Sequence, residues 1–262
     1  MQYICNVLEY NVYSFEEKIK EKKDWLFFLR QVQEDRKYEL ILDKIPENTP
    51  IYNNVMEQFI NFLHIDWYKE GINLKTKEIF DIRYCLLTKR IVFPIHNLKG
   101  EIISVKGRYI PDENERVDYN VMPKYLYLYP FYKSIELFNL HRAYEEIKRK
   151  KQVIVLESEK ATMLATQWGI KNCVSIMGSE LSPVQVFKLK QLGLDTELIF
   201  MWDKDKNEEF ILKQLSQLKN RKVKYMWDEF NLLNEKNSPT DRGELIFNIL
   251  YSEYLREIFK GD

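Results

Sequence analysis

The sequence is poor in the residues that mark disordered, extracellular and membrane-spanning chains. It has only 8 glycines and 8 prolines in 262 residues, so long disordered tails and repetitive fibrous folds are not expected. Its three cysteines, Cys5, Cys85 and Cys173, are far apart, which excludes a disulfide scaffold and a zinc ribbon within this chain. No apolar run is long enough to cross a bilayer, and the first residues lack the basic start of a signal peptide. We therefore expect a reduced, cytoplasmic setting and no membrane partner.

The sequence also has no excess charge of either sign. Lysine and arginine number 40, and aspartate and glutamate also number 40. A nucleic-acid partner therefore needs a local basic patch, and non-specific binding should be weak and sensitive to salt. The apolar fraction is 45% and the aromatic fraction 14%, which is enough for a folded core in two compact subdomains.

The first half of the chain predicts helices followed by an antiparallel hairpin. Apolar residues at helical spacing predict helices over residues 14–35 and 51–71, the second with Gly71 as its C-terminal cap. Two strand-like runs, 89–95 and 101–110, flank a short polar turn and predict a hairpin. A linker rich in tyrosine and proline follows, and a basic helix then leads into the second half.

The second half alternates apolar strands with helical segments, which predicts a parallel sheet flanked by helices and an α/β fold class. A final helix is expected to pack back on this domain. The predicted strands cover residues 152–157, 173–176, 197–202 and 221–228, and the final helix covers residues 244–259.

Acidic residues follow two of these strands. Glu157 ends one strand, and Asp203 and Asp205 follow another. Because the carboxyl ends of parallel strands meet at one edge of a sheet, we expect these three side chains to converge. Two carboxylates about 6 Å apart repel by about 3 kcal/mol at an effective dielectric of about 20. A divalent cation relieves that repulsion, and all-oxygen ligands favour Mg²⁺ over Zn²⁺, so the sequence predicts metal-assisted phosphoryl transfer.

Each carboxylate taken alone has a simpler interpretation. Glu157 can cap the helix that follows its strand, and Asp203 can be the N-cap of a helix that begins before Lys206. Their occurrence together at matching strand ends favours the metal site.

Basic residues lie near both ends of the predicted hairpin. Lys89, Arg90, Lys106 and Arg108 can contact a polyphosphate, or they can act as gatekeepers that flank an apolar strand, and the composition favours neither interpretation. Lys124 lies among the tyrosines of the linker, which suit stacking on nucleic-acid bases and interdomain packing equally well.

Several stretches, taken in order, resemble the catalytic core of bacterial-type (DnaG-like) DNA primases in the form found in phages and mobile elements. The stretches are KRIVFPIHNLKGEIISVKGRYI, PKYLYL, ELFNLHRA, VIVLES, GIKNCVSIMGSELS and FMWDKDK, and the last three resemble the Toprim module of that family. The similarity runs from about Tyr68 to Asp241. It implies an α+β primase-core subdomain over residues 1–150, a Toprim domain over 151–236, and an acidic loop with a C-terminal helix over 237–262.

The resemblance also implies a role for individual residues. The catalytic and metal-binding residues are Glu157, Asp203 and Asp205. The nucleotide- and template-binding residues that it implies are Arg108 and Lys124, and the glycine-led turn that begins with Gly178 and Ser179 matches the family's. Lys106, Arg90 and Lys89 are further candidates because they lie on the same hairpin as Arg108. The candidates for the late acidic loop are Asp228 and Asp241.

This chain departs from the family pattern near the acidic residues. Ser158 and Ala161 stand where the family usually has glycine and aspartate, and Asn237 stands where the late loop commonly has aspartate. Glu159 is an additional acid and becomes a fourth candidate metal ligand.

The function implied by the resemblance is that of a DNA primase, a DNA-directed RNA polymerase that makes short RNA primers on single-stranded DNA from ribonucleoside triphosphates. The cofactor is Mg²⁺, with Mn²⁺ as the alternative, and no zinc is expected in this chain. The family's zinc-ribbon and helicase-binding domains have no counterpart here, so a replicative helicase or a separate zinc-ribbon protein is an expected partner of a monomeric core. The expected setting is the cytoplasm of a bacterium or a phage-infected bacterium. The alternatives are a non-catalytic, primase-derived DNA-binding accessory protein and a Toprim nuclease.

Overall fold

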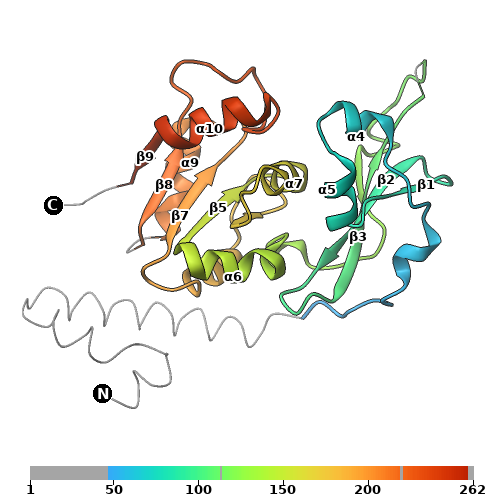
Figure 1. Ribbon diagram of the computed structural model, residues 1–262, viewed down its shortest axis with the longest axis horizontal. Coiled ribbons are helices and arrows are strands. Elements are labelled where there is room, and N and C mark those ends of the chain that lie inside the picture. The colour runs from blue at the N-terminus through green and yellow to red at the C-terminus, as the bar shows by residue number, and fades with distance from the viewer. Residues whose placement is uncertain (1–46, 113, 219–220, 259–262) are drawn as a thin grey trace, which may run out of the picture. The chain divides into compact units, whose positions relative to one another are not determined.

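The computed structural model describes residues 47–112, 114–218 and 221–258. The helix expected over residues 14–35 lies outside them. Pro46–Asp262 form one compact unit, and its described part contains two β-sheets (Figure 1). The α/β class predicted from the sequence is confirmed.

The first sheet is antiparallel, with its four strands in the order β1-β2-β3-β4. The predicted hairpin is formed by β2 and β3, which pair Phe93 with Lys106. At its turn, the side-chain oxygen of Asn97 accepts hydrogen bonds from the backbone N–H groups of Lys99 and Glu101, both at 3.0 Å. The strands are β1 (Arg83–Cys85), β2 (Arg90–His96), β3 (Ile102–Tyr109) and β4 (Tyr125–Tyr127).

Strand β4 lies in the segment that was expected to be a linker. Its Tyr-Leu-Tyr sequence alternates in the way strands do, and it pairs antiparallel with β3. The register sets Tyr125 opposite Arg108 and Tyr127 opposite Lys106. The tyrosine-rich segment therefore lies directly beside the basic strand.

The continuous helix predicted over residues 51–71 is wrong. Ile60 and Tyr84 exchange two backbone hydrogen bonds, both at 2.9 Å, and this bridge holds the chain extended where the helical pattern is strongest. Gly71 nevertheless follows α4 with φ at 98°, a conformation that glycine adopts without strain. The helical segments of this half are η1 (Val55–Gln58), α4 (Ile65–Lys69), α5 (Leu74–Ile79) and η2 (Lys133–Ile135).

The second sheet has the strand order β6-β5-β7-β8-β9. The four strands predicted from the sequence are present and parallel, and a fifth strand, β9, joins the edge antiparallel to β8. The strands are β5 (Gln152–Leu156), β6 (Cys173–Ser175), β7 (Glu197–Met201), β8 (Val223–Met226) and β9 (Leu255–Glu257).

The C-terminal helix is shorter than predicted. It ends at Glu253 instead of continuing to residue 259, because the next residues form β9. The backbone N–H of Trp227 donates to the carbonyl oxygen of Tyr254 at 2.9 Å, which starts this pairing. The helices of this half are α6 (Leu140–Lys150), α7 (Glu159–Gln167), α8 (Pro183–Lys190), α9 (Glu208–Leu215), η3 (Ser216–Leu218) and α10 (Gly243–Glu253).

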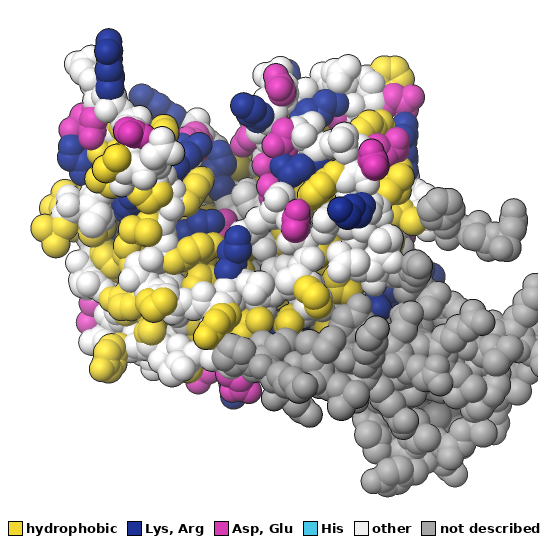
Figure 2. Space-filling view, turned by 180° about the vertical axis from the view of Figure 1, so that it is seen from behind, with side chains coloured by type: hydrophobic (Ala, Val, Ile, Leu, Met, Phe, Trp, Pro, Cys, Tyr) yellow, Lys and Arg dark blue, Asp and Glu magenta, His cyan; other side chains and the backbone are white. Residues whose placement is uncertain are grey.

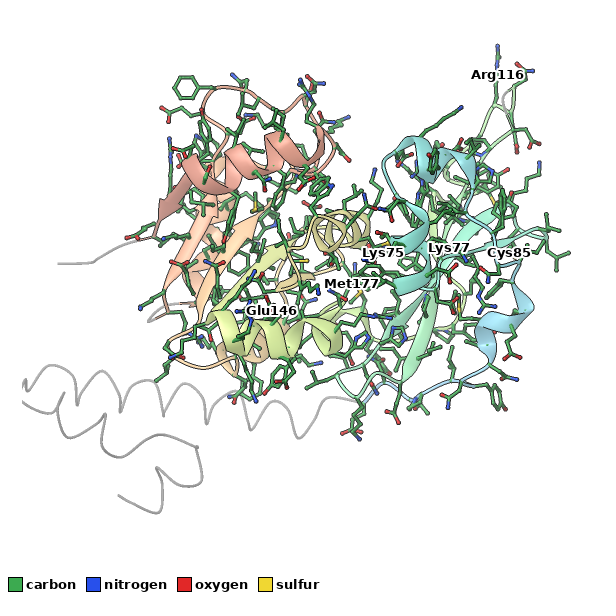
Figure 3. All side chains as sticks on the ribbon, viewed as in Figure 1. Lys75, Lys77, Cys85, Arg116, Glu146 and Met177 are labelled. Carbon is green, nitrogen blue, oxygen red and sulfur yellow. The ribbon has the colours of Figure 1, made fainter. Side chains whose placement is uncertain are left out.

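One hydrophobic cluster joins the two sheets. It contains Trp67 and Phe93 from the antiparallel half together with Met163 and Met177 from the parallel half. Figure 3 labels Met177, which lies between the helices of the parallel half and α5. This shared core fixes the end of the parallel sheet against β3 and α4. No helix of the described ranges is long and apolar enough to cross a membrane.

Candidate active site

Glu157 and Asp203 lie at the carboxyl ends of two adjacent parallel strands. Strands β5 and β7 pair Leu156 with Met201, so the residues that follow them emerge at the same edge. The atoms Glu157 Oε2 and Asp203 Oδ1 are both buried and accept no hydrogen bond. Buried carboxylate oxygens without hydrogen bonds are costly, so a partner in addition to the Lys206 ammonium, which lies 3.5 Å from Glu157 Oε2, would stabilise them.

Neither carboxylate caps a helix. Ser158 is the N-cap of α7, where its side chain accepts from the backbone N–H of Ala161, and Asn207 is the N-cap of α9. The simpler interpretation of Glu157 and Asp203 is therefore wrong.

The electrostatic environment of this acidic pair disfavours its full ionisation. Burial, followed by the negative charges of Glu157 and Asp241, raises the pKa of Asp203 to about 7. Burial also raises the pKa of Glu157, and the nearby Lys206 offsets only part of that effect. A bound cation would favour the ionised form of both carboxylates.

Asp205 and Lys206 complete the centre. Lys206 Nζ lies 2.6 Å from Asp205 Oδ1 and 3.5 Å from Glu157 Oε2, and the lysine side chain is 15% exposed. Among the described residues, no three histidine, cysteine, aspartate or glutamate side chains are arranged as a metal site. Glu157 Oε2 and Asp203 Oδ1, which have no hydrogen bond, still fit a hard divalent cation, with Asp205 as a further oxygen donor.

Glu159, expected as an additional metal ligand, is paired with Lys106. Its two oxygens accept hydrogen bonds from Lys106 Nζ at 2.6 and 2.8 Å, and both side chains are buried. Lys106 also lies over the rings of Tyr125 and Tyr127, 4.8 and 5.2 Å from their centroids. This pair links β3 to the first residue of α7 and leaves neither charge unpartnered.

Arg108 belongs to a chain of ion pairs that connects the two halves. Its guanidinium donates two hydrogen bonds of 2.7 Å to Glu70, which also accepts from Lys160 at 2.8 Å. Lys160 in turn lies 3.2 Å from Asp241. Burial alone would raise the pKa of Glu70, but the hydrogen bonds from Arg108 and Lys160 outweigh it and lower the pKa to about 2. Asp241 therefore lies next to this series of ion pairs and also next to Asp203.

The other predicted basic residues are dispersed. Arg90 is buried, and its guanidinium donates to the carbonyl oxygens of Gly107 and Lys124, both at 3.4 Å. Lys89 is paired with Asp112 in an exposed loop. Lys124 is exposed, and its ammonium lies 5.9 Å from the ring centroid of Tyr125. Of these cations, only Lys124 presents its charge to solvent without an ion pair among the described residues.

The remaining predicted residues lie near the parallel-strand ends. A Cβ on Gly178 would lie 3.1 Å from Lys133 Nζ, the end of a flexible side chain, so the lysine would have to shift by a few tenths of an ångström. The carbonyl oxygen of Ser179 accepts from the indole N–H of Trp202 at 2.9 Å. Asp228 is buried, and its carboxylate accepts from the backbone N–H groups of Leu232 and Leu233, both at 2.8 Å. Asp228 therefore organises the loop after β8.

A cavity of about 140 Å³ opens beside the acidic centre. Its walls come from both sheets, and Figure 2 shows Lys and Arg side chains interspersed with Asp and Glu around a hollow on one face. The charged residues that line the cavity are Lys106, Glu157, Glu159, Lys160 and Asp203, and the aromatic ones are Trp67, Phe93 and Tyr125.

Sequence reasoning missed Glu70, Lys160 and Lys206 as parts of this centre. Lys206 follows the Asp-x-Asp pair and Lys160 follows Glu159, so position relative to known acids was an available signal for both. Glu70 is 38 residues from Arg108 and 90 from Lys160, so no local sequence pattern indicates that it pairs with them.

The chain is similar in sequence and in fold to the catalytic core of bacterial DNA primases. Residues 16–144 match the family model described as DNA primase catalytic core, N-terminal domain. The DNA primase of Legionella pneumophila is 33% identical over 138 residues, which is 52% of this chain and 22% of that protein. The resemblance predicted from the sequence is confirmed.

One relative matches more of the chain. The SPbeta prophage-derived uncharacterized protein YorJ of Bacillus subtilis (strain 168) is 27% identical over 226 residues, or 77% of this chain and 60% of that protein. This chain thus spans 60% of the prophage protein and about a fifth of the Legionella primase.

Solved primase cores share the fold. The zinc-binding and RNA polymerase domains of the Aquifex aeolicus primase superpose with a TM-score of 0.59 at 22% identity, covering 74% of this chain and 55% of that one. A DnaG primase catalytic domain bound to single-stranded DNA superposes with a TM-score of 0.55 at 17% identity, covering 71% and 72%.

Proposed function

We propose that this chain is a primase core that joins ribonucleotides on a single-stranded DNA template by Mg²⁺-dependent nucleotidyl transfer. The observation that carries the proposal is the pair of buried oxygens of Glu157 and Asp203, neither with a hydrogen bond, at adjacent strand ends. The Toprim arrangement that the sequence resembles uses acids at these positions, and the relatives that match include DNA primases.

Glu157, Asp203 and Asp205 would hold the metal in this mechanism. When bound, Mg²⁺ supplies charge neutralisation and orientation for a 3′-hydroxyl that attacks the α-phosphate of the next ribonucleotide, with release of pyrophosphate. The chain's own contribution is positioning. The buried ion pair of Glu159 and the half-buried ion pairs of Glu70 hold Lys106, Arg108 and Lys160 in fixed places beside the cavity.

Template contacts are expected on the side of the cavity formed by β3 and β4. Tyr125 is 41% exposed and lies in the cavity wall, with the ammonium of Lys124 beside its ring. An exposed aromatic ring next to a lysine suits a base stacked over a neighbouring phosphate. One solved structure of the same fold is a catalytic domain bound to single-stranded DNA, which supports single-stranded DNA as the ligand.

A second candidate function has an observation in its favour. Lys206 already neutralises part of the acidic centre, and the described residues contain no complete metal site. A non-catalytic, primase-derived accessory protein that binds DNA without synthesis would have these properties.

Incubation of the chain with single-stranded DNA, labelled ribonucleotides and Mg²⁺ or Mn²⁺ separates the functions. Labelled oligoribonucleotides support the primase, cleaved DNA indicates a nuclease, and DNA retention without product indicates the accessory protein. For the primase, Asp203→Asn should lower synthesis by at least about 100-fold. The matched control is Asp195→Asn, an exposed acid paired with Lys151, which should leave synthesis unchanged.

A further inference from the structure

Lys206 projects into the acidic centre although its chain neighbour faces solvent. The Asp205 side chain is 40% exposed, whereas that of Lys206 is 15% exposed. The backbone N–H of Lys206 donates to the carbonyl oxygen of Asp203 at 3.2 Å, and this turn directs the chain back toward the strand ends. The ammonium then lies between Asp205 and Glu157.

The neighbouring lysine takes a different direction. Lys204 Nζ donates to the carbonyl oxygen of Asp228 at 2.7 Å and lies 3.2 Å from its carboxylate, which belongs to the loop after β8. Lys204 therefore binds the loop after β8, and Lys206 binds the acidic centre. Only Lys206 reaches the centre formed by Glu157 and Asp203.

The Lys206 ammonium satisfies only part of the acidic centre. It carries one charge and three N–H donors, and here it hydrogen-bonds Asp205 while Glu157 Oε2 and Asp203 Oδ1 remain without a hydrogen bond. A divalent cation carries twice the charge and coordinates several oxygens at once. The ammonium and such a cation repel each other when both occupy one centre.

We propose that Lys206 is an internal counter-ion of the acidic centre, which a divalent cation must displace in order to bind Glu157, Asp203 and Asp205. The inference rests on the proposed function, because that function supplies the cation. It assigns Lys206 as the residue that sets the metal affinity: the centre is charge-compensated when metal is scarce, and metal binding requires the lysine side chain to swing toward solvent.

Direct measurement of Mn²⁺ binding tests the inference without reliance on activity. Isothermal titration calorimetry of the full chain should show at least roughly tenfold tighter Mn²⁺ binding for Lys206→Gln than for the parent, since a repelling charge is removed. Lys206→Arg keeps the charge and should bind as weakly as the parent. Lys213→Gln, an exposed lysine of α9, is the matched control and should also bind like the parent.

Further variants locate the effect. Lys206→Gln combined with Asp203→Asn should lose the tighter binding, because the two-carboxylate centre is then incomplete. Unchanged, weaker or absent Mn²⁺ binding by Lys206→Gln overturns the inference, and so does tight binding that survives in the double variant. Thermal unfolding without metal checks that each variant is folded. The melting temperature of Lys206→Gln should be lower than that of the parent and should rise again when Mn²⁺ is added.

Primer synthesis by the same proteins separates this inference from the proposed function. If Lys206→Gln binds Mn²⁺ more tightly but no variant makes RNA, the counter-ion assignment stands and the primase assignment fails. If the parent makes RNA while Lys206→Gln binds Mn²⁺ no more tightly, the primase assignment stands and the counter-ion assignment fails.

Discussion

Lys106 of β3 and Glu159 of α7 form a buried ion pair between residues 53 positions apart. We expect Glu159→Gln to lower the free energy of unfolding by about 3 kcal/mol, because it leaves the Lys106 ammonium buried without a compensating charge. Urea denaturation followed by circular dichroism measures the change. The double variant Lys106→Met, Glu159→Leu removes both charges and should recover most of the loss. An equal loss of unfolding free energy in the single and double variants would contradict this explanation.

Glu70 restrains two cations, and its removal should affect stability and DNA binding in opposite directions. Glu70→Gln should cost about 1–2 kcal/mol of stability, since Arg108 and Lys160 lose their shared carboxylate. The same change should tighten binding to single-stranded DNA, because Arg108 loses its carboxylate partner and becomes available to phosphate, while Lys160 keeps only Asp241. Fluorescence anisotropy measures the affinity. Glu146→Gln, which removes a comparable two-bond partner of Arg149 on the surface, should change neither quantity.

Lys124 and Tyr125 should contribute to DNA binding by different physical effects. Lys124→Gln should make the slope of log affinity against log salt shallower by about 0.7, the value for one lost phosphate contact on a single strand. Tyr125→Ala should weaken binding by about 1–3 kcal/mol with little change in that slope, because stacking carries no net charge. Lys148→Gln removes an exposed lysine that also lies over a tyrosine ring, that of Tyr144, and should change neither. Equal slopes for all proteins would exclude a phosphate contact at Lys124.

Two histidines should make stability depend on pH. The rings of His96 and His141 lie 4.5 Å apart between centroids, and the Nδ1 atom of each is buried without a hydrogen-bond partner. Burial, followed by the charge of Arg142, lowers the pKa of His96 to about 3 and that of His141 to about 4. As the pH falls below the ordinary value of 6.5, the unfolded chain takes up protons that the folded chain does not, so stability is lost.

The expected loss is about 1.4 kcal/mol per pH unit for each histidine between pH 6 and 5. Urea midpoints at pH 7, 6 and 5 measure it. Glu70, with its pKa lowered from 4.5 to about 2, loses its contribution only at lower pH, so the two effects are separated. Asp203, whose pKa is raised to about 7, gains stability as the pH falls through the same window and opposes the histidines. The histidine contribution is therefore the difference between the parent and a variant with both His96 and His141 replaced by glutamine, and identical profiles for the two proteins would refute the assignment.

Strands were predictable where the local pattern is strong. The apolar runs that became β5, β7 and β8, and the turn that closes the β2–β3 hairpin, are encoded within a few neighbouring residues. The helix expected over residues 51–71 failed because a distant partner, Tyr84, pairs with Ile60. The shorter final helix has the same explanation, since β9 exists only by pairing with β8.

The acidic residues of the candidate site could be predicted because strand direction alone brings Glu157 and Asp203 to one edge. The distribution of cations could not be predicted. Lys106, Arg108 and Lys160 are each held by a carboxylate far away in the sequence, and Arg90 is buried against backbone carbonyls. The count of basic residues on the hairpin therefore overestimated how many are open to a ligand.

The two borders of the parallel sheet limit how copies of this protein can associate. On one side the three-residue β9 presents Arg256 and Glu257, and on the other β6 is covered by a backbone bridge from Phe138 to Ser175. Long, flat, uncharged edge strands are the ones that pair with a strand from another molecule. Here neither border offers such a template, so growth of this sheet from one molecule into the next is disfavoured.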